Sequence, residues 1–365
     1  MLRQDDRPFP LEGVPTVCAY NPTKTRVAIT DGSRLMIRAT SDAASDGYPT
    51  SSSLPSDCDV STSIVDTVSY GAITSMCWAG EGQGHVIVCG TEKGVIMMYS
   101  EGKNERMGIS NAGYGMVGEV ARYSTSAVVC IERVDGIMGN KRSAAVIQGA
   151  PATPSTVASS TLVAVGHKDG VVRLYECSAL DDSSMLRLHS VIQCPVDGVM
   201  TRAACIASSV SPPSPAHAGD TSTIVLLVGY VAGSDAASKS LLRAYQYDAC
   251  HFTWEEIELG IDLDDSGAPG GPIASIAWAP LMGRDDDLIA VAVGTAVKLY
   301  SMRGALSNVV VKEVATLSHP AAVWQVKVNM TGTWLAASTD NNEVCLWRPD
   351  LTGEWVLLNT IRGDK

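Results

Sequence analysis

Hydrophobic and polar residues alternate in short runs along the segment from His319 to Gly363. Residues 323–328 have the two-residue period of a β-strand. Three further apolar runs follow, and residues that favour turns, such as the polar triplet 340–342, separate each run from the one before it. The pattern predicts four antiparallel strands, the third of which ends in Trp347.

Weaker copies of this order of strands and turns recur upstream. A repeated unit of four strands, with a tight turn before the third, is typical of a WD-repeat β-propeller. The sequence therefore predicts an all-β fold, a single six-bladed propeller domain that spans residues 1–365. The third strands end at Arg38, Tyr99, Tyr175, Tyr245, Tyr300 and Trp347. The predicted blades occupy residues 14–68, 72–123, 127–194, 201–260, 272–317 and 319–362.

Two insertions interrupt the repeat. Residues 133–160 and 208–222 combine proline with small polar residues, so we predict that both are disordered. The outer strand of the second blade is expected at residues 117–123, after a polar loop. These insertions explain why the predicted units are longer than a regular WD repeat of about 40–45 residues.

The ends of the chain bear on whether the ring of blades is closed. The run 355–361 already completes the sixth blade, and Pro10 and Pro15 make the N-terminal segment a poor closing strand. Blades one and six are therefore expected to face each other across a gap, where a partner adds strands or a whole seventh blade. The alternative, in which residues 1–13 close the ring, is left open. The expected partner-binding residues are Val17, Cys18, Tyr20, Val323, Trp324 and Val326.

Composition narrows the range of ligands. The chain has 27 Lys and Arg against 39 Asp and Glu, a formal net charge of −12. Without a basic stripe, direct binding of nucleic acid is not expected. The longest apolar run, 224–232, is too short to span a bilayer, so no direct membrane insertion is expected, and no signal peptide is recognised. Ten cysteines without C-x-x-C pairs predict buried free thiols in a reducing compartment.

The sequence contains none of the common catalytic motifs, such as a nucleophile elbow, a P-loop or H-E-x-x-H, so we expect no enzyme activity and no cofactor. Residues 262–267 superficially resemble a calcium loop, but Ile273 stands where a bidentate Glu is needed. The histidines form no metal-binding cluster with cysteine, so no metal is expected. His319, Asp340 and Trp347 are expected to form a structural hydrogen-bond network within the last blade, in preference to a catalytic His–Asp pair.

Four stretches together resemble one family of propellers. The last two blades contain IASIAWAPLMGRDDDLIAVAV at 273–293 and VWQVKVNMTGTWLAASTDNNEVCLWRPDLTGEW at 323–355. Blades three and four contain LVAVGHKDGVVRLYE at 162–176 and VGYVAGSDAASKSLLRAYQYD at 228–248. In order and spacing these stretches resemble the Seh nucleoporin family, which is paralogous to the COPII outer-coat propeller Sec-thirteen. Blades one and two match weakly, and the two insertions depart from the family pattern.

The resemblance implies a structural scaffold subunit of the Y-shaped outer-ring coat complex of the nuclear pore. In that family the open propeller is completed by a blade from an α-solenoid nucleoporin, beside other outer-ring nucleoporins, and the complex supports protein and mRNA transport at the nuclear envelope. Family members also serve in the GATOR (SEA) complex at lysosomes or vacuoles. The alternatives are a COPII-type vesicle coat subunit and a WD-repeat adaptor that binds peptides.

Overall fold

The structure is a computed structural model that describes most of the chain between residues 17 and 363. Within the described residues, twenty-four strands form six sheets of four antiparallel strands each. None of the helices in this part of the chain has the length and apolarity to cross a membrane. The described residues are 17–32, 34–39, 63–66, 68–79, 86–101, 114–116, 122–134, 161–178, 185–193, 201–211, 223–232, 239–248, 251, 253–261, 263, 271–279, 284, 286–303, 309–329 and 331–363.

The first three blades follow the chain in order. Blade one consists of β1 (Val17–Tyr20), β2 (Arg26–Thr30), β3 (Arg34–Ala39) and β4 (Ser63–Asp66). The 3-10 turn η2 (Val68–Tyr70) leads to blade two, with β5 (Ile73–Trp78), β6 (Val86–Thr91), β7 (Ile96–Glu101) and β8 (Tyr114–Met116). Blade three consists of β9 (Val128–Val134), β10 (Thr161–His167), β11 (Val172–Ser178) and β12 (Met185–Ile192).

The last three blades repeat the same topology. Blade four consists of β13 (Thr201–Ser211), β14 (Thr223–Ala232), β15 (Lys239–Asp248) and β16 (Thr253–Ile257). Blade five consists of β17 (Ile273–Ala279), β18 (Asp287–Val293), β19 (Ala296–Arg303) and β20 (Val310–Ser318). Blade six consists of β21 (Val323–Val328), β22 (Leu335–Thr339), β23 (Glu343–Pro349) and β24 (Trp355–Arg362).

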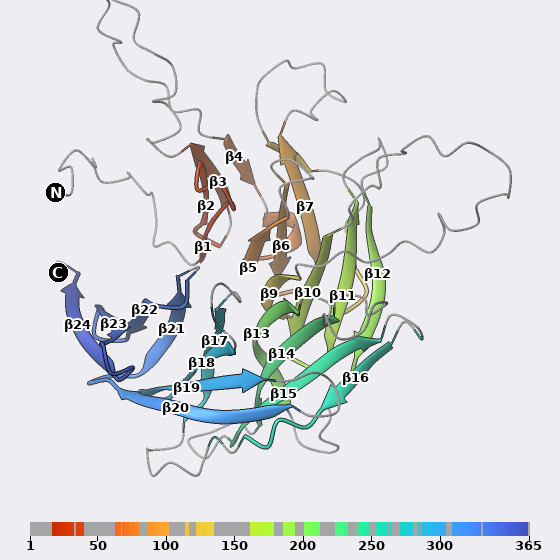
Figure 1. Ribbon diagram of the computed structural model, residues 1–365. Helices are drawn as coiled ribbons and strands as arrows, with labels where there is room; N and C mark the ends of the chain where they lie inside the picture. Colours follow the sequence, from red (N-terminus) through yellow and green to blue (C-terminus); the bar gives the residue numbers. More distant parts are fainter. Residues whose placement is uncertain are drawn as a thin grey trace, which may run out of the picture.

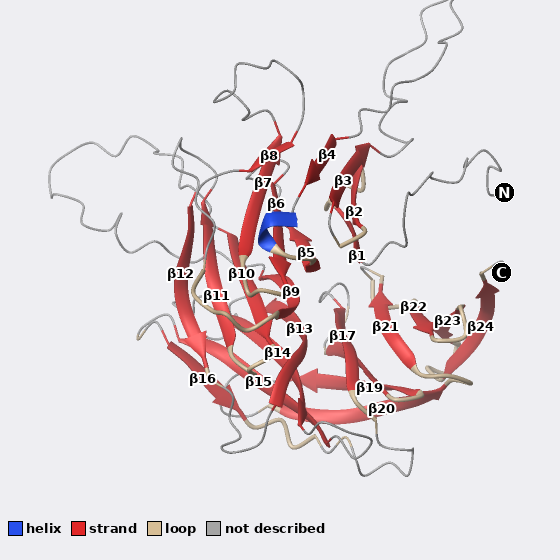
Figure 2. Cartoon of the chain, turned by 180° about the vertical axis from the view of Figure 1, so that it is seen from behind, coloured by secondary structure: helices blue, strands red, loops and turns tan. Residues whose placement is uncertain are grey.

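The six sheets follow one another around a common centre, as Figures 1 and 2 show from opposite sides. Each sheet has its strands in chain order, and the first strand of a blade packs on the first strand of the next. The predicted all-β propeller of six blades is therefore confirmed.

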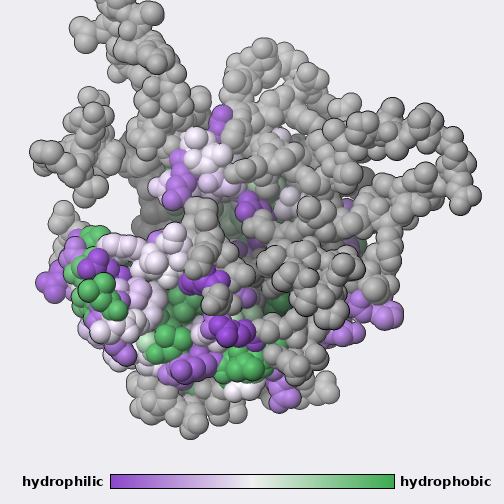
Figure 3. All heavy atoms as spheres, in the orientation of Figure 1, coloured by the Kyte–Doolittle hydropathy of each residue, from purple (hydrophilic) through white to green (hydrophobic). Residues whose placement is uncertain are grey.

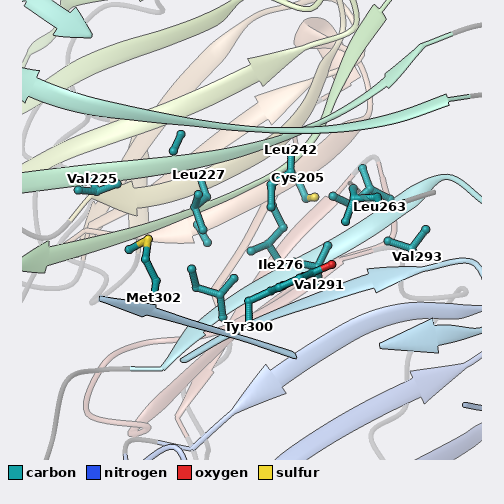
Figure 4. Packing of buried hydrophobic residues seen from close by; sticks show 14 of the residues in the cluster. Cys205, Val225, Leu227, Leu242, Leu263, Ile276, Val291, Val293, Tyr300 and Met302 are labelled. Carbon is teal, nitrogen blue, oxygen red and sulfur yellow. The ribbon is translucent and has the colours of Figure 1, made fainter. Parts of the chain in front are cut away.

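The core lies between neighbouring blades. All six residues of β6 are buried, because both faces of this strand are covered. Between blades four and five, Leu227 of β14 packs near Ile276 of β17 and Met302 of β19 (Figure 4). Burial of one such aliphatic side chain contributes about 1.5–3 kcal/mol. The fold is therefore stabilised by contacts between blades as much as by pairing within them.

The first strand of each blade is its inner strand. Glycines in the second strands of blades two and three allow the inner strand of the next blade to approach closely. A Cβ built on Gly90 would lie 2.5 Å from Val128 Cγ1 and 2.9 Å from Ile131 Cδ1, both in β9. A Cβ on Gly166 would lie 2.9 Å from Ala203 Cβ, in β13 of blade four, and 2.6 Å from Cys130 Sγ of its own blade. Real side chains do not approach so closely, so these positions exclude any larger residue without displacement of the adjacent blade.

We expect Gly90→Ala to lower the free energy of unfolding by about 1–3 kcal/mol, the usual cost of an added methyl group in a packed interior. Denaturant unfolding followed by circular dichroism measures this change. Gly363→Ala is the control, because its added Cβ would meet its nearest neighbour at 3.5 Å, an ordinary contact. Equal stability of the two variants would contradict the close approach of β9 to Gly90.

Blade two departs from the prediction at its outer edge. Its fourth strand is β8, which pairs with β7 through Met116 and Tyr99, rather than a strand at 117–123. Of the predicted stretch the structure describes only Arg122 and Tyr123, which lie outside any strand. The prediction was wrong because a strand of three residues is too short to show an alternating pattern in the sequence.

Both predicted insertions begin later than expected. β9 continues through Val134, opposite Leu162, and β13 continues through Ser211, opposite Thr223. Residues 133–134 and 208–211 are therefore ordered, because the ladder hydrogen bonds of the adjacent strand extend each sheet into the polar sequence. The rest of the two insertions lies outside the described residues, as does the segment 1–13.

Candidate partner-binding face of the open propeller

Among the described strands, each blade packs on the next one, but blade six does not pack on blade one. β1 packs on β5, and the series continues through β9, β13 and β17 to β21. Among the described strands, no comparable packing joins β21 to β1. Figures 1 and 2 both show blades one and six at the two ends of this series. One face of blade six and one face of blade one are therefore left without a neighbouring blade.

The buried face of blade six belongs to the core shared with blade five. Val323 and Val326 of β21 join Leu335 and Ala337 of β22 in this core. Val323 is 2% exposed and Val326 is 0% exposed. The two valines share this side, although they are three residues apart, because the strand is bulged at Trp324. Gln325, next to Val326, therefore points to the other side of the sheet.

The register of the sheet defines that other side. Gln325 lies opposite Ser338, Ser338 opposite Val344, and Val344 opposite Ile361. A parallel row runs through Lys327, Ala336, Leu346 and Asn359. We call the residues of these two rows, with Trp324, the open face of blade six: Trp324, Gln325, Lys327, Ala336, Ser338, Val344, Leu346, Asn359 and Ile361.

The open face of blade six is accessible, and its apolar side chains lie among the polar residues Gln325, Lys327, Ser338 and Asn359. Trp324 is 54% exposed and Ile361 is 51% exposed, whereas Val344 and Leu346 are half-buried. The outer strand β24 adds the exposed side chain of Val356, which lies opposite Arg348, whereas Leu357 lies opposite Trp347 on the side of blade five. Hydrophobic side chains gather at the position of β24 in Figure 3. Exposed apolar side chains among polar ones on an uncovered sheet are typical of protein interaction sites.

Blade one presents a smaller counterpart. Cys18 of β1 lies opposite Ile29 of β2, and Ile29 lies opposite Met36 of β3. Tyr20, two residues after Cys18, is 60% exposed. The side chains that alternate with them, those of Val17 and Ala19, pack instead on the core shared with blade two. Cys18, Tyr20, Ile29 and Met36 therefore form the open face of blade one.

Half of the residues expected to bind a partner lie on the open faces, and half do not. Cys18, Tyr20 and Trp324 lie there. For Val17, Val323 and Val326 the structure requires a correction, because their side chains pack on the cores shared with blades two and five. Residues missed from the sequence are Gln325, Val344, Leu346, Ile361, Ile29 and Met36. The two-residue period could have found those on β2, β3 and β23, whereas the bulge at Trp324 breaks the period in β21 and hides Gln325.

The expected network in blade six is present only in part. The Trp347 indole donates a hydrogen bond to His319 Nε2 over 3.1 Å. His319 Nδ1 lies 3.0 Å from the Leu317 carbonyl oxygen, so with Nε2 as acceptor the ring proton is on Nδ1. The Asp340 side chain is exposed and makes no hydrogen bond to another described residue, so Asp340 lies outside the network. The adjacent turn is held instead by Thr339, whose hydroxyl donates to the Glu343 carbonyl over 3.1 Å.

The neutral form of His319 is favoured in the folded chain. Burial lowers the pKa of His319 below its ordinary value of 6.5, against the opposing effect of the carbonyls of Leu317 and Thr295. Burial likewise lowers the pKa of His167. Both histidines therefore bind a proton more readily in the unfolded chain than in the folded one.

We expect the free energy of unfolding to fall as the pH falls below about 6.5, because the unfolded chain takes up protons first. Each histidine contributes at most about 1.4 kcal/mol per pH unit until its folded-state pKa is reached, and nothing is lost above pH 7. Urea unfolding at pH 7.5, 6.5 and 5.5 measures the slope. His319→Gln is expected to reduce it, and a slope unaffected by this substitution would contradict the buried neutral state of His319.

Few side chains among the described residues are suited to catalysis or metal binding. Burial raises the pKa of Cys130 and that of Cys177 to about 12, so both thiols are protonated and unreactive at neutral pH. Among the described residues no group of three His, Cys, Asp or Glu side chains is arranged to hold a metal ion. Of the calcium-like loop 262–267, the structure describes only Leu263. The described open faces instead present uncovered β-sheet with exposed apolar side chains such as Trp324 and Ile361.

Comparisons with known proteins identify relatives over part of the chain. The model of the WD domain, G-beta repeat, matches residues 311–348. Nucleoporin SEH1-A of Xenopus laevis is 27% identical over 216 residues, which are 56% of this chain and 54% of that protein. Protein SEH1 of Arabidopsis thaliana is 26% identical over 207 residues, 54% of this chain and 60% of that protein. The matched segment thus spans little more than half the length of these relatives.

Two further matches extend the comparison. Protein transport protein sec13 of Neurospora crassa is 33% identical over 89 residues, which are 24% of this chain and 29% of that protein. Among solved structures, the Dos1 propeller superposes with a TM-score of 0.51 at 12% identity, and covers 97% of this chain and 73% of that one. The last comparison supports the propeller fold alone.

Proposed function

We propose that this chain, a WD-repeat propeller related to the SEH1 nucleoporins, is a non-catalytic scaffold subunit of the outer-ring, Y-shaped coat complex of the nuclear pore. The observation that carries the proposal is the open face of blade six, where Trp324 and Ile361 are exposed and which no blade of the described chain covers. A subunit of a coat complex needs a large permanent interface, and obligate interfaces are rich in apolar surface.

The proposed mechanism is completion of the ring by another chain. An α-solenoid nucleoporin inserts strands or a whole blade between blades six and one. Hydrogen bonds to the main chain of the inserted segment give affinity, and the apolar open faces give specificity through the shape of the side chains they accept. In this role the chain needs neither a cofactor nor a metal, and it acts at the nuclear envelope in support of nucleocytoplasmic transport.

Affinity purification of the tagged chain, with mass spectrometry and fluorescence imaging, tests the proposal. We expect an α-solenoid nucleoporin in equimolar amount, other outer-ring nucleoporins beside it, and fluorescence at the nuclear rim. Recovery of the chain alone, or a distribution that avoids the nuclear rim, would overturn the proposal.

A vesicle-coat subunit is the second candidate, and the match to the sec13 protein of Neurospora crassa favours it. The same face would then be filled by a blade from a coat protein. Fluorescence at sites of vesicle budding from the endoplasmic reticulum, together with recovery of coat subunits in place of nucleoporins, would select this candidate.

A further inference from the structure

Each inner strand from blade two onward contains one bulged residue at the same place relative to the second strand. Because the two strands go out of register there, the next residue faces the following blade. The bulged residues are Thr74, Val129, Ala204, Ala274 and Trp324. The residues that follow them are Ser75, Cys130, Cys205, Ser275 and Gln325.

The residue after the bulge binds the main chain of the next blade. Ser75 Oγ accepts the Ile131 N–H over 2.9 Å, and Ser275 Oγ accepts the Val326 N–H over 3.2 Å. Ile131 and Val326 occupy the same place in their strands, since each directly follows the residue after its own bulge. This inter-blade hydrogen bond therefore has the same acceptor position and the same donor position in two separate pairs of blades.

A second inter-blade hydrogen bond reaches a carbonyl three residues earlier in the next strand. The Thr74 hydroxyl donates to the Val128 carbonyl over 2.7 Å, and the Cys130 thiol lies 3.8 Å from the Ala203 carbonyl oxygen. Val128 and Ala203 each directly precede a bulged residue. Side chains at the bulge thus meet one N–H and one C=O of the next inner strand.

Blade six differs from the others at these positions. Gln325 replaces the short Ser75 or Ser275, and its amide carries both an acceptor oxygen and a donor nitrogen. That amide makes no hydrogen bond to any residue the structure describes. Ser338 lies opposite Gln325, at the place that Gly90 occupies in blade two. The Ser338 side chain would keep an adjacent strand farther from β22 than Gly90 keeps β9 from β6. The glutamine side chain is long enough to span this larger distance.

We propose that Gln325 binds the main chain of an extended strand that a partner protein inserts beside β21, and that Trp324 covers this contact. The amide oxygen accepts the N–H of the inserted strand, and the amide nitrogen donates to its C=O, in place of the two separate contacts of earlier blades. The inference rests on the proposed function, in which a partner supplies the missing blade. The inference goes further by naming Gln325 and Trp324 as the side chains that bind the first inserted strand.

We infer that Gln325 binds a β-strand of a partner because side chains at the equivalent positions of the earlier blades bind main-chain groups. Every earlier contact of this kind in the described blades is made to main-chain N–H or C=O groups of a β-strand. β1 is an unsuitable recipient, since it pairs with β2 without the bulge that positions those groups in blades three, four and six.

The test compares Gln325→Ala with the wild-type chain in its complex with the purified α-solenoid nucleoporin. Loss of two hydrogen bonds is expected to raise the Kd about tenfold to hundredfold. The melting temperature of the isolated chain should stay within about 2 °C of wild type. Lys312→Ala, an exposed residue of β20, should leave the Kd within about twofold. An unchanged Kd for Gln325→Ala overturns the inference, yet leaves the proposed function intact as long as the wild-type chain binds.

A second measurement identifies the occupant directly. The chain with the photo-crosslinker p-benzoylphenylalanine at position 324 is irradiated in the same complex, and the joined peptides are sequenced. Crosslinks to a β-strand of the partner support the inference. Crosslinks to residues 1–13 of this chain, or to helices of the partner, overturn it. If the wild-type chain does not bind the nucleoporin at all, the proposed function has failed rather than the assignment of Gln325.

Discussion

Val326→Asp is expected to abolish the folded propeller. Val326 is 0% exposed and packs in the core between blades five and six, with Ala337 and Leu335 beside it. A carboxylate there has lost its water, and the valines and alanines of this core offer it no charged partner. Burial of such a group costs several kcal/mol at least, against a total stability of about 5–15 kcal/mol for a typical domain.

Circular dichroism and size-exclusion chromatography check this result, with Val310→Asp as a matched control. Val310 is a valine of β20 that is 65% exposed, so its replacement adds the same charge without burying it. A folded, monomeric Val326→Asp chain that melts at the wild-type temperature would contradict the position of Val326 in the core.

The result also bears on how partner binding is tested. The sequence places Val326 among the expected partner-binding residues, so a charge at this position would appear to be a probe of the interface. In the structure the side chain faces blade five. Loss of the partner from Val326→Asp would then report an unfolded chain rather than a blocked surface.

The fold could be predicted from the sequence because its signals are local. Alternation over 323–328, a turn at 340–342 and an apolar run that ends at Trp347 lie within one blade, and each predicts its own strand or hairpin. Repetition of that local pattern then fixes the number of blades. Errors arose where a strand is short, as in β8, or where hydrogen bonds to a neighbour extend a strand into polar sequence, as at Ser211.

The candidate site could not be predicted in the same way because it depends on which neighbour is missing. Val323 and Trp324 are both apolar and adjacent, yet the first is 2% exposed and the second 54%. The bulge between Val323 and Gln325 decides which side chains face blade five. Asp340 is a second example. Its position before the third strand suggests that it joins a hydrogen-bond network, but in the structure the hydrogen bond links only His319 and Trp347.

Val344→Asp combined with Leu346→Asp is expected to abolish partner binding and leave the propeller folded. Both side chains lie on β23 and face the side of the sheet opposite the core shared with blade five. Both are half-buried rather than enclosed, so water can hydrate the carboxylates in the free chain. An inserted blade would bury two unpaired charges, and the resulting penalty of several kcal/mol is expected to weaken binding by more than about a hundredfold.

Titration of the α-solenoid nucleoporin against the double variant measures this loss, and the melting temperature of the isolated variant checks its fold. Val310→Asp again adds charge to exposed sheet, here on the outer strand of blade five, and should bind as wild type. A folded double variant with wild-type affinity would show that the partner does not cover the open face of blade six. The contrast with Gln325→Ala separates two contributions: apolar contact over β23 holds the blade as a whole, whereas the Gln325 amide fixes the position of its first strand.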